Sequence, residues 1–200
     1  MMNETWLTDV TLNTGMIYLR PLEWGDREAL IEAASDGELW KLWFTSVPSA
    51  ETIDAYIDKA LRDKEKGEAL AFVVGLQETG QIIGCSRFCH ADSLNKRVEI
   101  GYTWYSKSYQ RTAVNSQCKL LLLSHAFEQL GAIAVEFKTH HSNERSQTAI
   151  MRLGAKHDGI LRQHQKLADG SYRDTYVYSI LNREWPDVKA RLALKTDLAS

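Results

Sequence analysis

The chain is poor in cysteine and proline, with three of each among its 200 residues. Cys85, Cys89 and Cys118 are too few, and odd in number, for the disulfide framework of a small secreted domain. Only His90 adds a metal-ligating side chain directly beside Cys85 and Cys89, and a metal site needs more ligands than that. We therefore expect buried thiols and no bound metal.

Strong net charge and long apolar runs are also absent. The formal net charge of −2 gives no general basic field for nucleic acid or for an anionic membrane. No stretch approaches the ~20 apolar residues of a membrane span. The first ten residues have neither the basic segment nor the apolar segment of a signal peptide. These absences predict a cytoplasmic protein with no nucleic-acid or membrane partner.

The chain does contain an ordinary apolar fraction, 44%, and no repeat or Pro/Gly/Ser-rich linker. Its length suits a single domain over residues 1–200, with a core at about 16–185 and a C-terminal helix at 183–194. Period-two apolar patterns predict strands, and period-3.6 patterns predict helices. The strands are expected at 16–21, 69–76, 81–90, 96–105, 132–139, 157–167 and 172–181. The helices are expected at 27–34, 50–66, 115–130, 143–153 and 183–194.

One strand–loop–helix segment points to a ligand. An apolar strand ends near Tyr105, a polar loop follows, and the loop opens a long helix at Asn115. The first turn of a helix leaves backbone N–H groups unpaired and carries partial positive charge. This segment therefore predicts a site for a phosphate group.

Several short motifs in this order resemble one known family. They are Leu19-Arg20-Pro21-Leu22, Gln81-Ile82-Ile83-Gly84, Glu99-Ile100-Gly101-Tyr102, Gln110 to Asn115, Asn143 with Ser146, Leu153-Gly154-Ala155, Gly159 to Arg162, and Asp169-Gly170 followed by Arg173-Asp174-Thr175 and Tyr178-Ser179. Their order and spacing resemble the Gcn5-related N-acetyltransferase (GNAT) superfamily, nearest to its ribosomal-protein N-terminal acetyltransferase (RimJ/RimL-like) branch. The resemblance covers roughly residues 16–185.

The resemblance implies an α+β fold and an activity. The fold would be a central, mostly antiparallel sheet of about seven strands with a splayed fourth and fifth strand and helices on both faces. The activity would be direct transfer of an acetyl group from acetyl-CoA to a primary amine, at a protein N-terminus or on a small molecule. The alternative is a non-catalytic acyl-CoA-binding or degenerate member that acts as a sensor or interaction module.

The resemblance also implies a cofactor site at the strand–loop–helix segment. The family loop is Gln/Arg-x-x-Gly-x-Gly/Ala; Gln110 matches it, whereas Ala113 and Asn115 replace the two small positions. Because alanine disfavours φ > 0, Ala113 also allows a helix start with weakened phosphate binding, and Asn115 suits a side-chain cap. The expected cofactor-binding residues are Tyr102, Trp104, Gln110, Arg111, Thr112, Ala113, Val114, Asn115, Asn143 and Ser146. Asn143 fits a plain N-cap as well as a ligand contact.

Two residues are expected to carry the chemistry. Glu99, among apolar strand residues, is expected to have a raised pKa and to take the proton of the acceptor amine; otherwise it is a structural residue facing solvent or paired with Arg97 or Arg87. Many GNAT enzymes have a tyrosine proton donor where this chain has Ile150. Ser146 would then assist the departing thiolate, or it only bonds to its own helix.

The acceptor side is less defined by the sequence. The aromatic connector that contains Trp40, Trp43 and Phe44 either lines the acceptor pocket or packs as core beneath the early helices. The residues name neither the acceptor amine nor the acyl chain length. They leave open a homodimer formed through the C-terminal helix.

Overall fold

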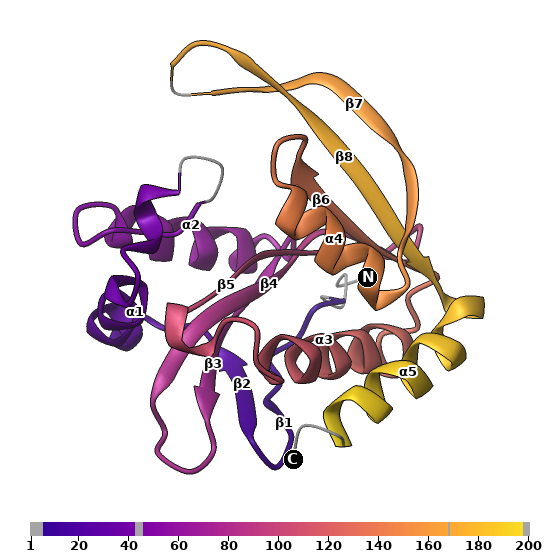
Figure 1. Ribbon diagram of the computed structural model, residues 1–200, viewed down its shortest axis with the longest axis horizontal. Coiled ribbons are helices and arrows are strands. Elements are labelled where there is room, and N and C mark those ends of the chain that lie inside the picture. The colour runs from indigo at the N-terminus through magenta and orange to yellow at the C-terminus, as the bar shows by residue number, and fades with distance from the viewer. Residues whose placement is uncertain (1–5, 43–45, 168, 198–200) are drawn as a thin grey trace.

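The computed structural model describes residues 6–42, 46–167 and 169–197 and contains one eight-stranded sheet (Figure 1). Its strands are β1 (Leu12–Asn13), β2 (Ile17–Pro21), β3 (Leu70–Leu76), β4 (Ile82–Asp92), β5 (Arg97–Tyr105), β6 (Ala134–His140), β7 (Lys156–Lys166) and β8 (Tyr172–Leu181). The spatial order is β1-β2-β3-β4-β5-β6-β8-β7, and only β5 and β6 pair in parallel. The expected α+β class is confirmed, and the strand beyond the expected seven is the two-residue β1.

Helices cover both faces of the sheet. They are α1 (Arg27–Ser35), α2 (Ile53–Glu65), α3 (Val114–Ser124), α4 (Glu144–Leu153) and α5 (Trp185–Asp197). Figure 1 shows α1 and α2 to one side of the strands, with α3 and α5 on the other. In the described part of the chain, no helix is long and apolar enough to cross a membrane.

Several helix boundaries differ from expectation, and the C-terminal helix runs from Trp185 to Asp197 and not over 183–194. The second helix begins at Ile53 and not at Ala50, because residues 50–52 form a turn and Thr52 occupies the N-cap position. The third helix begins at Val114, and beyond Ser124 it continues as a π-helical turn, His125–Gln129. Both helices keep the apolar faces that their spacing predicts.

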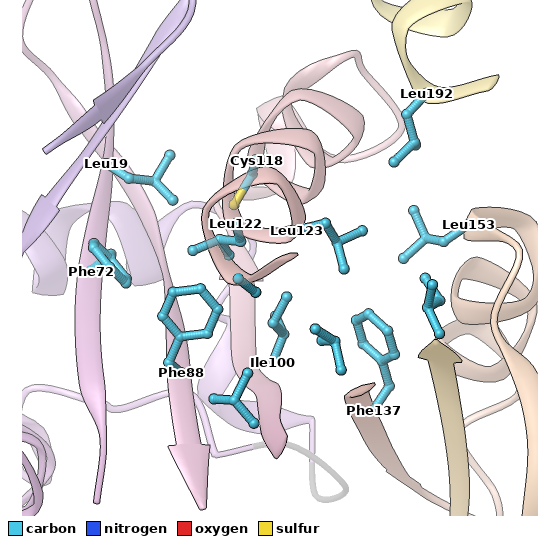
Figure 2. Close-up of a cluster of buried hydrophobic side chains, with 14 of the residues drawn as sticks. Leu19, Phe72, Phe88, Ile100, Cys118, Leu122, Leu123, Phe137, Leu153 and Leu192 are labelled. Carbon is cyan, nitrogen blue, oxygen red and sulfur yellow. The ribbon is translucent and has the colours of Figure 1, made fainter. Parts of the chain in front are cut away.

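The larger hydrophobic core lies between the sheet and α3, α4 and α5 (Figure 2). Phe72, Phe88, Ile100 and Phe137 project from four different strands toward this side, where Leu122 of α3 meets them. The rings of Phe72 and Phe88 meet edge to face with centroids 5.7 Å apart. Each such side chain stabilises the fold by roughly 1.5–3 kcal/mol through burial.

The smaller core lies under α1 and α2, on the opposite face. Side chains alternate across a strand, so Ala71 and Val73 of β3 point here while Phe72 points toward α3. Trp104 belongs to this second core, where its indole N–H donates to the hydroxyl of Tyr56 at 3.3 Å. α1 and α2 are therefore fixed to the half of the sheet that ends at β5.

Candidate active site

The sheet opens between β5 and β6. These two strands pair from Arg97↔Ala134 to Glu99↔Glu136 and then separate. Beyond that point β5 stays with β4 as far as Tyr105, and β6 stays with β8 as far as His140. In parallel strands, the crevice beyond the carboxyl ends is where ligands bind. The expected splay of the fourth and fifth predicted strands is confirmed, and α3 and α4 begin at its two sides.

A β-bulge lies on the β5 side of this opening. Gly101 is opposite Arg87 and Trp104 is opposite Cys85, so Tyr102 and its neighbour together face a single residue of β4. Tyr102 has φ = +51°, a value that non-glycine residues adopt rarely and that concentrates at functional sites. The bulge therefore turns the backbone of Tyr102 at the opening, where the sequence predicts a cofactor contact.

Arg87 lies directly beneath this bulge. Its guanidinium is 4.3 Å from the ring centroid of Tyr102 and 5.3 Å from that of Tyr56, and the side chain is 1% exposed. None of its side-chain nitrogens has a hydrogen-bond partner among the described residues, and a carboxylate oxygen of Asp63 lies 3.8 Å away. The cation is thus held mainly by two aromatic faces.

The loop before α3 is fixed by its own side chains. The amide of Gln110 donates to the carbonyl of Tyr105 at 2.9 Å, and the hydroxyl of Thr112 donates to the carbonyl of Tyr109 at 2.7 Å. Ala113 has φ = −65°, so alanine at this family position is unstrained. The positive φ of the loop, +63°, falls at the exposed Arg111.

The start of α3 is open to an anion. Thr112 Oγ1 accepts the N–H of Val114 at 3.3 Å, and the N-cap residue Ala113 has no side-chain oxygen to accept the N–H groups that follow. Asn115 does not cap the helix, so that expectation is wrong: it lies inside the first turn, where its Oδ1 accepts the hydroxyl of Tyr105 at 3.4 Å. The side chain of Val114 is buried in the larger core.

The start of α4 is capped instead. Asn143 is the N-cap, and its Oδ1 accepts the N–H of Ser146 at 3.0 Å, so the capping interpretation is confirmed. Arg145 donates to the side-chain oxygen of Gln110 at 3.2 Å. This bond joins α4 to the loop before α3, and so it links Gln110 to the helix that Asn143 caps.

Glu99 lies at the last β5–β6 pair and faces away from α3. It is 7% exposed, and its Oε2 is 2.9 Å from both Lys138 Nζ and His90 Nδ1. Burial raises the pKa of this carboxyl, but the hydrogen bond from His90 and the charge of Lys138 outweigh burial and leave the pKa below its ordinary value. The expected raised pKa is therefore wrong. The partners that the structural alternative named are wrong too, because Arg97 pairs with Glu136 at 2.6 Å and Arg87 has no hydrogen-bond partner among the described residues.

A second bulge brings His90 to this carboxylate. His90 has φ = +50° where β4 shifts register, so adjacent Cys89 and His90 both approach Glu99. The ligand-type atoms of the three residues lie within 4.8 Å of one another, a donor set that suits zinc. The ammonium of Lys138 already lies against the carboxylate, however, and a second cation there would be repelled. The hydrogen bond to Glu99 raises the pKa of His90 above its ordinary value.

Lys119 of α3 was missed by the sequence interpretation. Its Nζ donates to Thr103 Oγ1 at 2.7 Å, the residue is 6% exposed, and burial lowers its pKa to about 8. The available signal was a lysine beside Cys118 that interrupts an otherwise apolar helix face continuing at Leu122 and Leu123. A lysine is rarely buried to this extent unless it is paired with an anion.

The remaining positions that the sequence singled out lie in or against the hydrophobic cores or outside the described residues. The Trp104 side chain packs in the core under α2, which leaves only its backbone near the bulge. Trp40 is half-buried and packs against the same core. Trp43 and Phe44 lie outside the described residues. Ile150 is buried and offers no hydroxyl, so no donor replaces the family tyrosine at that place.

Comparisons with known proteins agree with this geometry. The family described as "Acetyltransferase (GNAT) domain" matches residues 17–156. An uncharacterized N-acetyltransferase, p20 of Bacillus licheniformis, is 31% identical over 88% of this chain and 98% of its own. The ribosomal-protein-serine acetyltransferase of Escherichia coli is 29% identical over 68% of this chain and 74% of its own. A GCN5-related N-acetyltransferase structure from Brucella melitensis superposes with a TM-score of 0.84 at 26% identity, covering 97% and 90% of the two chains.

Proposed function

Because the chain belongs to the acetyltransferase (GNAT) family, and so is an acyltransferase, we propose that it moves an acetyl group from acetyl-CoA directly to a primary amine. The observation that carries the proposal is the opening between β5 and β6, with a helix starting at each side. A long, narrow acyl donor suits a crevice between separated strands, and its phosphates suit an uncapped helix start.

The residues present fit this cofactor. Ala113 offers no side-chain acceptor to the N–H groups that follow Val114 at the start of α3, and Arg111 adds an exposed positive charge in the loop before the helix. The bond from Arg145 to Gln110 links the two sides of the opening, and Asn143 caps α4 on its own side. When bound, acetyl-CoA supplies the activated acetyl thioester. A RimL acetyltransferase solved in complex with coenzyme A shares the fold, with a TM-score of 0.72 at 20% identity, which supports the placement at the level of the fold.

Glu99 is the proposed base. Its lowered pKa keeps it ionised at neutral pH, and a carboxylate is the form that accepts a proton. Lys138 and His90 hold the carboxylate in one orientation while its buried position limits access of water. Ser146, whose N–H is engaged by Asn143, is proposed to contact the cofactor near its sulfur.

The proposed acceptor is the N-terminal amine of a protein. Its support is two names: the Escherichia coli relative is a ribosomal-protein-serine acetyltransferase, and the RimL structure is that of a ribosomal L7/L12 alpha-N-protein acetyltransferase. The charged face of the sheet, with Glu99 and the exposed side of His90, is the proposed approach for the amine. Trp40, Trp43 and Phe44 remain the proposed acceptor-side residues.

Binding of the cofactor is the first test. Isothermal titration with acetyl-CoA and CoA should give saturable binding by the wild type, and at one hundred times Kd the ligand should stabilise the fold by about 2.7 kcal/mol. Ala113→Asp places a carboxylate at the start of α3, where it repels phosphate, and should weaken binding at least tenfold. Ala113→Gly is the matched control and should bind at least as well as the wild type.

Turnover is the second test. Release of free CoA thiol should be detected when acetyl-CoA meets a panel of peptides with free N-termini. Saturable cofactor binding without turnover on peptides, amino acids, polyamines or aminoglycosides would favour the alternative, an acyl-CoA sensor, to which buried Ile150 at the donor position would then point. Absence of binding at millimolar ligand would contradict the cofactor site itself.

A further inference from the structure

Lys119 occupies the opening from the α3 side. Its Nζ donates to Thr103 on β5, at 2.7 Å, and lies 6.0 Å from the ring centroid of Phe137 on β6. Both contacts lie past the last β5–β6 pair, at Glu99 and Glu136. The side chain therefore reaches between the two strands just beyond the point where they separate, and it is 94% buried there, since only 6% is exposed.

The ammonium of Lys119 has no counter-ion in the described part of the chain. An ammonium can donate three hydrogen bonds, and its partner here is the neutral oxygen of Thr103. That oxygen is shared with the hydroxyl of Ser86 at 2.8 Å. A buried cation without an anion is costly, so such a group gains stability when negative charge develops beside it.

The protonation of Lys119 suits this position. The titratable groups whose charge would act on Lys119 are the thiols of Cys118, on its own helix, and Cys89, on β4. Burial raises the pKa of both thiols, so they are neutral at pH 7. Burial lowers the pKa of Lys119 to about 8, and a general acid works best when its pKa lies near the operating pH.

We propose that Lys119 is the acid that protonates the departing sulfur, an inference that rests on the proposed transfer from acetyl-CoA. As the carbon–sulfur bond breaks, its electron pair stays on sulfur, and the sulfur takes a proton from Nζ. Lys119 is left as a neutral amine, and solvent returns its proton after the product leaves. The role accounts for a site in which Ile150 stands where the family's tyrosine donor is expected.

The two proton transfers, from the amine to Glu99 and from Lys119 to the sulfur, then involve groups on opposite faces of the sheet. Glu99 lies on the face away from α3, and Lys119 enters from α3. Gly101 lies beside Glu99, where an added Cβ would come within 3.2 Å of the Glu99 carboxylate and 3.3 Å of the Cys89 sulfur. A base and an acid on opposite sides can act on the two ends of one reaction without neutralising each other.

The direct test is the titration of bound CoA. The wild type and Lys119→Met are each saturated with CoA, and the ultraviolet absorbance of the thiolate is followed against pH. The wild type should form bound thiolate at least one pH unit lower than Lys119→Met, because only the wild type offers a buried ammonium as its partner. Gln117→Leu is the matched control, since Gln117 is a buried polar residue of the same helix that hydrogen-bonds Thr14.

A pH–rate profile gives a second readout. Above pH 8 the wild-type rate should fall, because Lys119 loses its proton in that range. Lys119→Arg should be slow at every pH and should show no fall of its own above pH 8, since a guanidinium keeps its proton throughout this range and cannot pass it to the sulfur. Lys119→Met should lower kcat at least tenfold with little change in KM for acetyl-CoA. It should fold, because it removes a buried unpaired charge, and its melting temperature should equal or exceed that of the wild type.

The outcomes separate this inference from the proposed function. Identical thiolate titrations in the wild type and Lys119→Met would overturn the role of Lys119 and leave acetyl transfer intact. A wild type that fails to bind CoA would overturn both. Mass spectrometry of the wild type after incubation with acetyl-CoA alone should show Lys119 unmodified, and stoichiometric acetylation of Nζ would make it a nucleophile and contradict the acid role.

Discussion

One face of β5 packs into the hydrophobic core, and the other face carries a cluster of charged side chains. Val98 and Ile100 point toward α3 and join the larger core, whereas Glu99, between them, points the other way into a cluster of charges. The alternation follows from strand geometry, in which successive side chains leave opposite faces. On one face stability comes from removing apolar area from water, and on the other it comes from pairing charges. The comparison separates the residues that hold the fold from those placed for chemistry.

The charged face is the less stabilising of the two. Lys138 is shared between Glu99 at 2.9 Å and Glu136 at 3.2 Å, so the loss of either carboxylate leaves it a partner. Buried ion pairs recover little more than the desolvation that they cost. A sequence selected for stability alone would have no need of this cluster, which supports a functional reason for it.

Glu99→Gln should have the largest effect of the variants proposed here, and that effect should be on activity and not on stability. Glutamine keeps the shape of the side chain but cannot accept the amine proton, so kcat should fall by about 10²- to 10⁴-fold. Lys138 retains Glu136, and we expect the melting temperature to change little. Steady-state kinetics and thermal melts on the same samples check this prediction.

Glu136→Gln is the matched control for Glu99→Gln. It removes the carboxylate opposite Glu99, which contacts Lys138 and Arg97 and has no proposed role in proton transfer. Its kcat should stay within about threefold of the wild type, given how little surface pairs contribute. Equal losses in the two variants would mean that the charge network as a whole, and not Glu99, supports turnover.

Phe88→Ala tests the apolar face. Phe88 is fully buried and packs against Phe72, so truncation should lower the free energy of unfolding by about 3–5 kcal/mol. Turnover per folded molecule should stay near wild type, because the ring points away from the charged face. Urea denaturation measures the free energy of unfolding, and activity normalised to the folded fraction measures turnover per folded molecule. A large loss of normalised kcat would erase the contrast between the faces.

The sequence predicts the apolar face far better than the charged one. Period-two and period-3.6 patterns report burial directly, so β8 was predicted to the residue and β5 to within one residue. The predicted start of α2 is wrong. Ser49 is a residue type that suits an N-cap, but Thr52, three residues later, occupies the N-cap position. Local patterns choose between neighbouring caps only weakly.

The candidate site depends on contacts that no local pattern encodes. The sequence identified Glu99 but neither of its partners, since Lys138 comes from a strand 39 residues away and His90 reaches it through a bulge. Because these partners were not identified, the sequence predicted a raised pKa for Glu99, whereas its pKa is lowered. Lys119 was missed for a similar reason: its function depends on where two strands separate, and spacing along one helix does not report that point.

Among the activity and stability changes predicted for the two faces, Arg87→Met should have a small effect. It also separates an effect on stability from an effect on CoA affinity most clearly. The guanidinium is buried without a hydrogen-bond partner among the described residues, so its removal should leave stability unchanged or slightly higher. Asp63 keeps Lys59 at 2.7 Å. The ring of Tyr102 loses a cation–π contact of roughly 0.5–2 kcal/mol, which should loosen the strained bulge and weaken CoA binding up to about tenfold. Titration calorimetry and thermal melts on Arg87→Met and Arg87→Lys measure the two effects separately. A fall in stability with unchanged CoA affinity would mean that Arg87 stabilises the fold and does not support cofactor binding. The charged face would then contribute to stability as the apolar face does.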